Sequence, residues 1–117
     1  MDIDALTHAL VRFRDERDWA QFHTLRNLIV SLNLEAAELL ELTQWKSDAE
    51  MAALPEDAAG MEALRDECAD VLLYLLQIAE RGGFDLLRAA AAKLEKNALK
   101  YPVEKCLGSS RKYTELD

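Results

Sequence analysis

Residues 61–81 read MEALRDECADVLLYLLQIAER and are followed by Gly82-Gly83, and this stretch decides the fold. Its middle, residues 71–76, is apolar on nearly every side, so a helix formed there has to be buried on most of its surface. The two glycines are typical of a helix C-terminus. The stretch therefore predicts a long central helix, and such a helix needs other helices around it.

Three other segments have the apolar spacing of helices. Residues 4–14 carry apolar side chains three or four positions apart. Residues 25–45 carry a continuous, leucine-rich stripe. A fourth helix is expected to start after Asp85 and to stop at Tyr101-Pro102, because proline cannot continue a helix. Together with the central helix, these segments predict an all-α fold.

We predict a single domain over residues 1–117, built as a four-helix bundle with an extended tail from about residue 103 to residue 117. The short segments 16–23 and 51–54 connect the helices, and the second of them is expected to form a turn of helix. The apolar surface of the central helix is more than one small bundle covers. This excess predicts a homo-oligomer.

The charge balance limits the possible partners. The chain has 117 residues and a net charge of −8, from 22 acidic and 14 basic side chains. Because this balance repels a large anionic polymer, nucleic acid is not an expected partner. A small phosphorylated ligand is compatible, since a divalent cation can bridge carboxylates to phosphates. The N-terminus lacks a signal-peptide pattern and no apolar run approaches the ~20 residues of a membrane span. We therefore expect a cytoplasmic protein without a membrane partner.

Two of the predicted helices each carry a pair of carboxylates three residues apart, Glu35 with Glu38 and Glu67 with Asp70. At ~100° per residue, both pairs fall at the rim of the apolar stripe. Four such groups together would repel one another strongly, and neither motif contains a Lys or Arg to neutralise them. Oxygen ligands of high charge suit Mg²⁺, or Mn²⁺, better than Zn²⁺. The spacing thus predicts a divalent-metal site.

Other interpretations of these residues exist. In a chain with 22 acids, an i, i+3 acidic pair arises easily by chance, and a single pair is usually a solvated face. A di-iron centre is not expected, because such bundles need Glu-x-x-His and neither His8 nor His23 follows an acid by three positions. Tyr74 interrupts the apolar run on the carboxylate face, where its hydroxyl needs a polar partner.

The motif Glu35-x-x-Glu38, followed after 28 residues by Glu67-x-x-Asp70, resembles the E-x-x-E…E-x-x-D signature of the all-α, MazG-like nucleoside triphosphate pyrophosphohydrolases. Three further stretches are similar to the dCTP pyrophosphatase branch of that family: WAQFH, QWKS and GSSRKYTEL, which start at residues 19, 44 and 108. The resemblance implies Mg²⁺-dependent hydrolysis of dCTP, or of a modified dCTP such as 5-methyl-dCTP, to the monophosphate and pyrophosphate. Such a reaction serves nucleotide-pool house-cleaning.

The resemblance also implies assembly into a dimer or a dimer of dimers, and it implies which residues act. The four motif carboxylates would bind Mg²⁺ and carry catalysis, with Glu38, or else Glu41, orienting the attacking water. Trp19 and Trp45 would form the base pocket. The other expected nucleotide-binding residues are His23, Lys46, Tyr74, Lys93, Asn97, Arg111 and Lys112. Each has an ordinary structural interpretation too, because a tryptophan at a helix end is more often packing and an exposed lysine more often solvent surface.

Three other functions are compatible with the sequence. The reaction could extend to dUTP or to damaged triphosphates, because base choice depends on hydrogen bonds that the sequence does not place. A helical interaction module would carry the same acids as a solvated surface. A metal-dependent nucleotide sensor would bind the nucleotide without cutting it.

Overall fold

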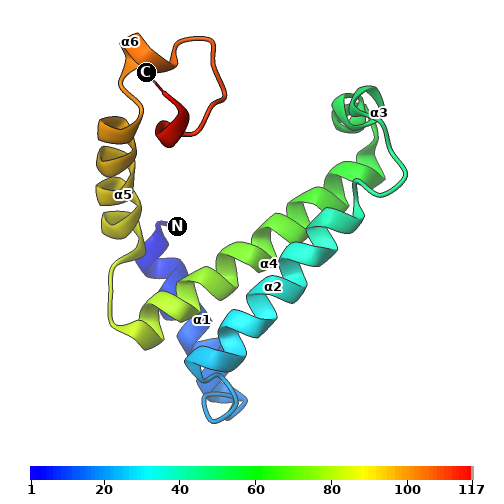
Figure 1. Ribbon diagram of the computed structural model, residues 1–117. Helices are drawn as coiled ribbons and strands as arrows, with labels where there is room; N and C mark the ends of the chain where they lie inside the picture. The colour runs from blue at the N-terminus through cyan, green and yellow to red at the C-terminus, as the bar shows by residue number, and fades with distance from the viewer. Residues whose placement is uncertain (117) are drawn as a thin grey trace. The chain divides into compact units, whose positions relative to one another are not determined.

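The computed structural model describes residues 1–116, and every regular element in that range is a helix (Figure 1). The predicted all-α class is therefore confirmed. The chain divides into two compact units, Met1–Gly83 and Phe84–Asp117. Whether the last long helix completes a four-helix bundle, and so a single domain, stays a prediction.

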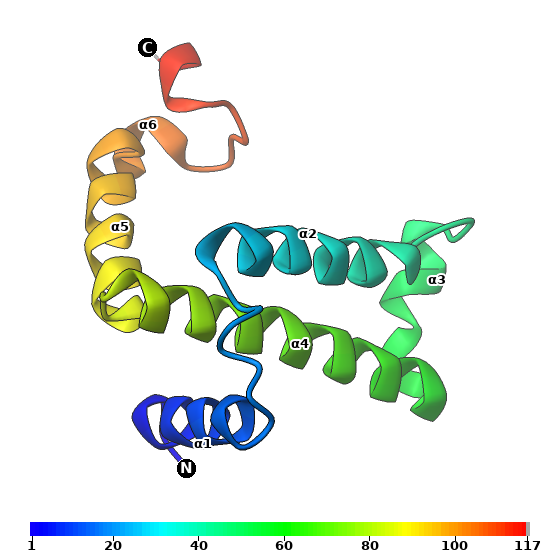
Figure 2. The ribbon, with the colours of Figure 1, turned by 90° about the horizontal axis from the view of Figure 1, so that it is seen from below.

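The first unit consists of three long helices and a short helical corner. Its elements are α1 (Ile3–Glu16), α2 (Leu25–Glu41), α3 (Asp48–Ala52), the 3₁₀ turn η1 (Leu54–Glu56) and α4 (Ala58–Gly82). Figure 2 shows α4 between α1 and α2, with α3 at the end where α2 leads into α4. The central helix predicted from the apolar stretch is thus covered on two sides by helices of its own unit.

The helix boundaries follow local capping chemistry. Thr24 caps α2, because its hydroxyl accepts a hydrogen bond from the backbone N–H of Asn27. The helix ends at Glu41, four residues earlier than predicted, and Trp45 then takes a left-handed φ of 66°. The predicted stop of α4 is confirmed, since Gly83 adopts a φ of 71° that favours glycine. Its start, Ala58, lies three residues before the predicted one.

The core of the first unit lies between α2 and α4. Leu28 of α2 is 1% exposed, and Leu76 and Ala79 of α4 are also buried. At the α3 end, Leu54 of η1 is buried close to the backbone of Gly60. A Cβ at residue 60 would lie 2.5 Å from Cδ1 of Leu54, so any larger residue would force the Leu54 side chain to shift.

Charged contacts join α1 and the following segment to the last turns of α4. The guanidinium of Arg14, which is buried, donates to Glu80 at 2.8 Å and to Asp15 at 2.9 Å. From α4, Arg81 donates to the carbonyl oxygen of Ala20 at 2.6 Å. The segment between α1 and α2 contains turns rather than a helix, and these contacts hold it against α4.

The second unit contains α5 (Leu86–Lys100), α6 (Val103–Cys106) and the 3₁₀ turn η2 (Tyr113–Glu115). Asp85 caps α5 as predicted, accepting from the backbone N–H of Arg88 at 3.0 Å. The tail is less extended than predicted, because it contains α6 and η2 and packs Tyr113 edge-on against Tyr101 at 6.1 Å. Within residues 1–116, no helix has the length and apolarity that crossing a membrane requires.

Candidate metal centre and nucleotide pocket

Three of the four predicted metal ligands converge between α2 and α4. Carboxylate oxygens of Glu35, Glu38 and Glu67 all lie within 4.8 Å of one another. The i, i+3 spacing places Glu35 and Glu38 on one side of α2, and the packing of α4 against α2 brings Glu67 to them. Asp70 is not part of this cluster, although it lies one turn after Glu67 on α4.

The electrostatics of the cluster favour a bound cation. Burial raises the pKa of Glu35 from 4.5 to about 7, and the neighbouring carboxyl group of Glu38 acts in the same direction. Burial also raises the pKa of Glu67, again with Glu38 as the next cause. The charge of Asp70 contributes to both shifts. These carboxylates therefore resist ionisation together.

The donor atoms fit a divalent metal. Oε2 of Glu35 and Oε2 of Glu67 are buried, and neither has a hydrogen-bond partner in the described part of the chain. Leaving a buried carboxylate oxygen without a partner is unfavourable, and a divalent cation supplies the missing partner to several such oxygens at once. Because every donor is a charged oxygen, the set suits Mg²⁺ better than a metal that prefers nitrogen or sulfur.

A pocket of about 230 Å³ lies within the first unit where α1, the following segment and α4 meet. Four of the sequence-predicted site residues line it together: Trp19, His23, Asp70 and Tyr74. The remaining lining residues are Leu10, Phe13, Arg14, Leu73 and Gln77. Asp70 thus borders the pocket and also acts electrostatically on the cluster, so it connects the two features.

Aromatic packing fixes one wall of the pocket. The ring of Trp19 meets Phe13 of α1 edge-on at a centroid distance of 5.7 Å, and the guanidinium of Arg17 covers the Phe13 ring at 3.7 Å. His23 lies 6.1 Å from Trp19, centroid to centroid. The indole ring of Trp19 is thus held in place, with 41% of the residue still exposed.

Trp45 does not line this pocket. It follows α2, whereas Trp19 precedes it, and the 17 residues of that helix span about 25 Å. Its side chain is almost free of contacts, with 91% of the residue exposed, and Lys46 is exposed beside it. Within one chain the two tryptophans therefore do not share a pocket. A base pocket formed by both stays a prediction for an assembly of several chains.

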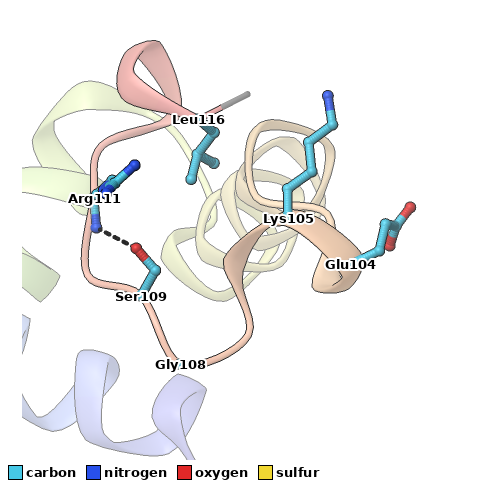
Figure 3. Close-up of a pocket in the computed structure, with 6 residues that line it drawn as sticks. All are labelled: Glu104, Lys105, Gly108, Ser109, Arg111 and Leu116. Atoms are coloured by element: carbon cyan, nitrogen blue, oxygen red, sulfur yellow. Dashed lines mark hydrogen bonds between the residues drawn. The ribbon is translucent and has the colours of Figure 1, made fainter.

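The remaining predicted residues belong to the second unit. Lys93 is exposed on α5 and Asn97 is half-buried there. Arg111 lines a pocket of about 540 Å³ in the tail, where its backbone N–H donates to Oγ of Ser109 at 3.3 Å (Figure 3). Lys105 lies across that pocket from Arg111, so its rim carries two cations. Lys112 is exposed next to Arg111.

Sequence reasoning missed Gln77 and Arg14. Gln77 carried a usable signal, because it is the one polar side chain in the apolar run after Tyr74 and falls on the same helix face as Asp70 and Tyr74. Arg14 gave no such signal. It is buried only because Glu80, 66 residues later in the chain, supplies its partner.

Comparison with known proteins decides the family. The profile of the MazG-like family matches residues 30–116, which include both acidic motifs and the tail. This chain belongs to the MazG-like family. Its three converging glutamates and Asp70 all lie inside the matched region, so the family assignment and the site rest on the same helices.

Relatives of this MazG-like chain carry a specific name. It is 47% identical over 104 residues to dCTP pyrophosphatase 1 of Rattus norvegicus and 45% identical to that of Homo sapiens. Each alignment covers 89% of this chain but 61% of the relative, so the chain spans about three fifths of their length. A solved pyrophosphatase from Archaeoglobus fulgidus superposes with a TM-score of 0.76 at 40% identity, over 85% of this chain and 91% of that one.

Proposed function

We propose that this chain hydrolyses dCTP, or a modified dCTP such as 5-methyl-dCTP, to the monophosphate and pyrophosphate in a Mg²⁺-dependent, house-cleaning reaction. The observation that carries the proposal is the carboxylate cluster of α2 and α4, with two buried oxygens that lack partners. Its connection through Asp70 to an aromatic pocket supports a nucleotide as the ligand. The names of the relatives support the choice of dCTP.

The glutamates of the cluster would bind the metal and accept a proton in the reaction. Glu35, Glu38 and Glu67 would hold Mg²⁺, which supplies charge neutralisation at the phosphates and a more acidic water. Glu38 is the exposed member, so its carboxylate can accept the proton of the attacking water. The water oxygen bonds to phosphorus, the phosphoanhydride bond between the α- and β-phosphates breaks, and monophosphate and pyrophosphate separate. Glu41, the alternative base, is not in the cluster.

The pocket would hold the base. Trp19 offers a ring face held rigid by Phe13, and base–aromatic stacking contributes about 1–3 kcal/mol per base. The polar groups of His23 and Tyr74 border the same space, where they can bond to the edge of the ring. A volume of about 230 Å³ suits a pyrimidine nucleoside better than a large ligand.

We further propose that the active form is a homo-oligomer. Five apolar residues of α2 are exposed in the single chain: Leu25, Ile29, Val30, Leu34 and Leu40. A second copy that covers this face could bring its own Trp45 and Lys46 to the pocket, which the separation along α2 forbids within one chain. Lys93, Asn97, Arg111 and Lys112 would contact sugar or phosphates. The abundance of exposed apolar surface supports this arrangement.

The decisive experiment incubates purified protein with the common dNTPs and NTPs and with 5-methyl-dCTP, with and without Mg²⁺. Products are separated to distinguish monophosphate plus pyrophosphate from diphosphate plus phosphate. We expect Mg²⁺-dependent monophosphate, formed fastest from cytosine deoxynucleotides. Equal turnover of dUTP or damaged triphosphates would replace the proposed substrate and keep the reaction.

The absence of turnover would leave two alternatives, which a melting experiment separates. A nucleotide sensor would be stabilised by Mg²⁺ together with dCTP, by mass action, without product. A helical interaction module would show no stabilisation by either. Glu62→Gln is a matched control for the cluster variants, because Glu62 is an exposed acid on the same helix, outside the cluster.

A further inference from the structure

The pocket contains a buried polar side chain, Gln77, for which the proposed reaction gives no role. Gln77 of α4 is only 8% exposed, and its Oε1 lies 2.7 Å from Nδ1 of His23, 54 residues earlier in the chain. Both residues line the pocket beside Trp19 and Asp70. A buried amide placed against an imidazole in this way determines what the imidazole can offer to a ligand.

The chemistry of the two groups fixes the proton on the ring. An amide oxygen accepts hydrogen bonds and cannot donate one, so with Oε1 of Gln77 facing the ring, Nδ1 of His23 carries the proton. In a neutral imidazole the other nitrogen, Nε2, then holds a lone pair. Nε2 has no hydrogen-bond partner within residues 1–116, and His23 borders the pocket. A ring in this position can therefore offer an acceptor to a ligand in the pocket.

We propose that Gln77 is a positioning residue that fixes the tautomer of His23 and thereby makes the pocket select a pyrimidine with an amino group at C4 over one with a carbonyl there. Cytosine carries an exocyclic amino group where uracil carries a carbonyl oxygen. The amino group donates to Nε2, whereas the carbonyl would face that lone pair without a hydrogen bond. This inference rests on the proposed function, because it assumes that a pyrimidine nucleotide occupies the pocket.

The expected selectivity is of the size that one hydrogen bond supplies. A site that offers an acceptor discriminates against a ligand lacking the donor by about tenfold or more, because two acceptors are then left facing each other. Without Gln77, the imidazole can place its proton on either nitrogen, and Nε2–H would suit a carbonyl. Removing the amide of Gln77 should therefore reduce the preference for cytosine over uracil, rather than weaken the binding of both bases equally.

Two variants of the full-length chain separate the roles of Gln77. Gln77→Leu keeps the approximate size and removes the acceptor, whereas Gln77→Glu keeps an oxygen acceptor in the same place. All measurements are made at about pH 8.5, above the ordinary pKa of an imidazole side chain. Gln44→Leu serves as the control for the His23 tautomer, because it makes the same exchange at an exposed glutamine beyond the C-terminal end of α2.

The first readout is the tautomer of His23 from ¹⁵N NMR, with His8, the other histidine of the chain, as the internal reference. The second is the ratio of dissociation constants for the non-hydrolysable α,β-imido analogues of dUTP and dCTP in the presence of Mg²⁺. Neither readout needs turnover. An inactive wild-type protein would therefore contradict the proposed hydrolysis while still testing this inference.

We expect the Nδ1–H tautomer and a ratio favouring the cytosine analogue in the wild-type protein and in Gln77→Glu. In Gln77→Leu the tautomers should mix and the ratio should fall about tenfold. A wild-type His23 with its proton on Nε2 would overturn the proposal. So would an unchanged ratio in Gln77→Leu, or a loss of affinity for both analogues by the same factor, which indicates a merely structural role.

Discussion

The two tryptophans of the first unit stand at opposite ends of α2 and have opposite environments. Trp19 packs edge-on against Phe13 and lines a pocket, whereas Trp45 has a left-handed backbone and a side chain exposed to solvent. A bulky residue in the left-handed region costs on the order of 1–3 kcal/mol. The comparison teaches that Trp19 has a role within its own chain, while the strain at Trp45 has no compensating contact there.

The largest expected effect on activity comes from the carboxylate cluster, which lies along α2 between the two tryptophans. Glu67→Gln removes a proposed metal ligand, so we expect kcat to fall at least 1000-fold, which corresponds to about 4 kcal/mol of barrier. Unfolding without metal should be no easier, because the variant relieves repulsion within the cluster. Steady-state kinetics with dCTP and Mg²⁺ measure the fall in kcat. The control variant Glu62→Gln is expected to keep kcat near the wild-type value.

Alanine variants of the two tryptophans should differ in stability, although both should lower activity. Trp19→Ala removes a packed ring, so we expect a loss of about 2 kcal/mol in the free energy of unfolding and a rise in KM of roughly tenfold or more. Trp45→Ala removes an exposed ring, so it should reduce activity while leaving the stability of the single chain unchanged. Urea denaturation and steady-state kinetics on both variants test the contrast. Equal destabilisation by both would contradict it.

Mixing inactive variants shows which chain Trp45 serves. In a random dimer of Trp45→Ala and Glu67→Gln chains, half of the dimers are mixed, and each would contain one site with both residues intact. If Trp45 acts across an interface, the mixture should regain about a quarter of wild-type activity. Co-refolding the two variants and assaying dCTP hydrolysis measures the recovery. No recovery would assign Trp45 to its own chain, or to no site at all.

A smaller effect concerns the pH dependence of stability. The pKa of Glu35 is raised to about 7 in the folded protein, so the folded state binds its proton more tightly than the unfolded state does. The contribution of Glu35 to the free energy of unfolding is therefore most favourable at low pH and declines as pH rises from 4.5 to about 7. Glu35→Gln should remove this decline.

The measurement for Glu35 compares urea denaturation of wild type and Glu35→Gln without metal at pH 5 and pH 8. The wild type should lose stability relative to the variant between these values. Added Mg²⁺ should restore the free energy of unfolding of the wild type at pH 8, and it should stabilise the variant less. A constant difference at both pH values would show that Glu35 has an ordinary pKa.

The smallest expected effect is at the backbone of Trp45. Trp45→Gly removes the left-handed strain, so we expect a gain of about 1 kcal/mol in the free energy of unfolding, partly offset by the greater freedom of the unfolded chain. Thermal denaturation measures this gain. Destabilisation instead would mean that the indole ring makes contacts in solution, as an oligomer interface would provide.

Much of the architecture could be predicted from the sequence because its signals are local. The apolar run after Glu67 and the Gly82-Gly83 stop specify α4, since periodicity and capping act within a few residues. The end of α2 could not be predicted, because the turn at Trp45 interrupts a pattern that otherwise continues. Leucine spacing alone does not show that Trp45, four positions after the last residue of α2, adopts a left-handed backbone conformation.

The sequence by itself determined the all-helical class, the spacing that puts Glu35 beside Glu38, and the family to which the chain belongs. These follow from helical periodicity and from motifs, which are properties of neighbouring residues. Only the tertiary structure decided that Glu67 joins the cluster while Asp70 borders the pocket, that Gln77 meets His23, and that α2 holds the two tryptophans apart. The physical reason is that these contacts depend on how α1 and α2 pack against α4, and packing joins residues that are far apart in the chain.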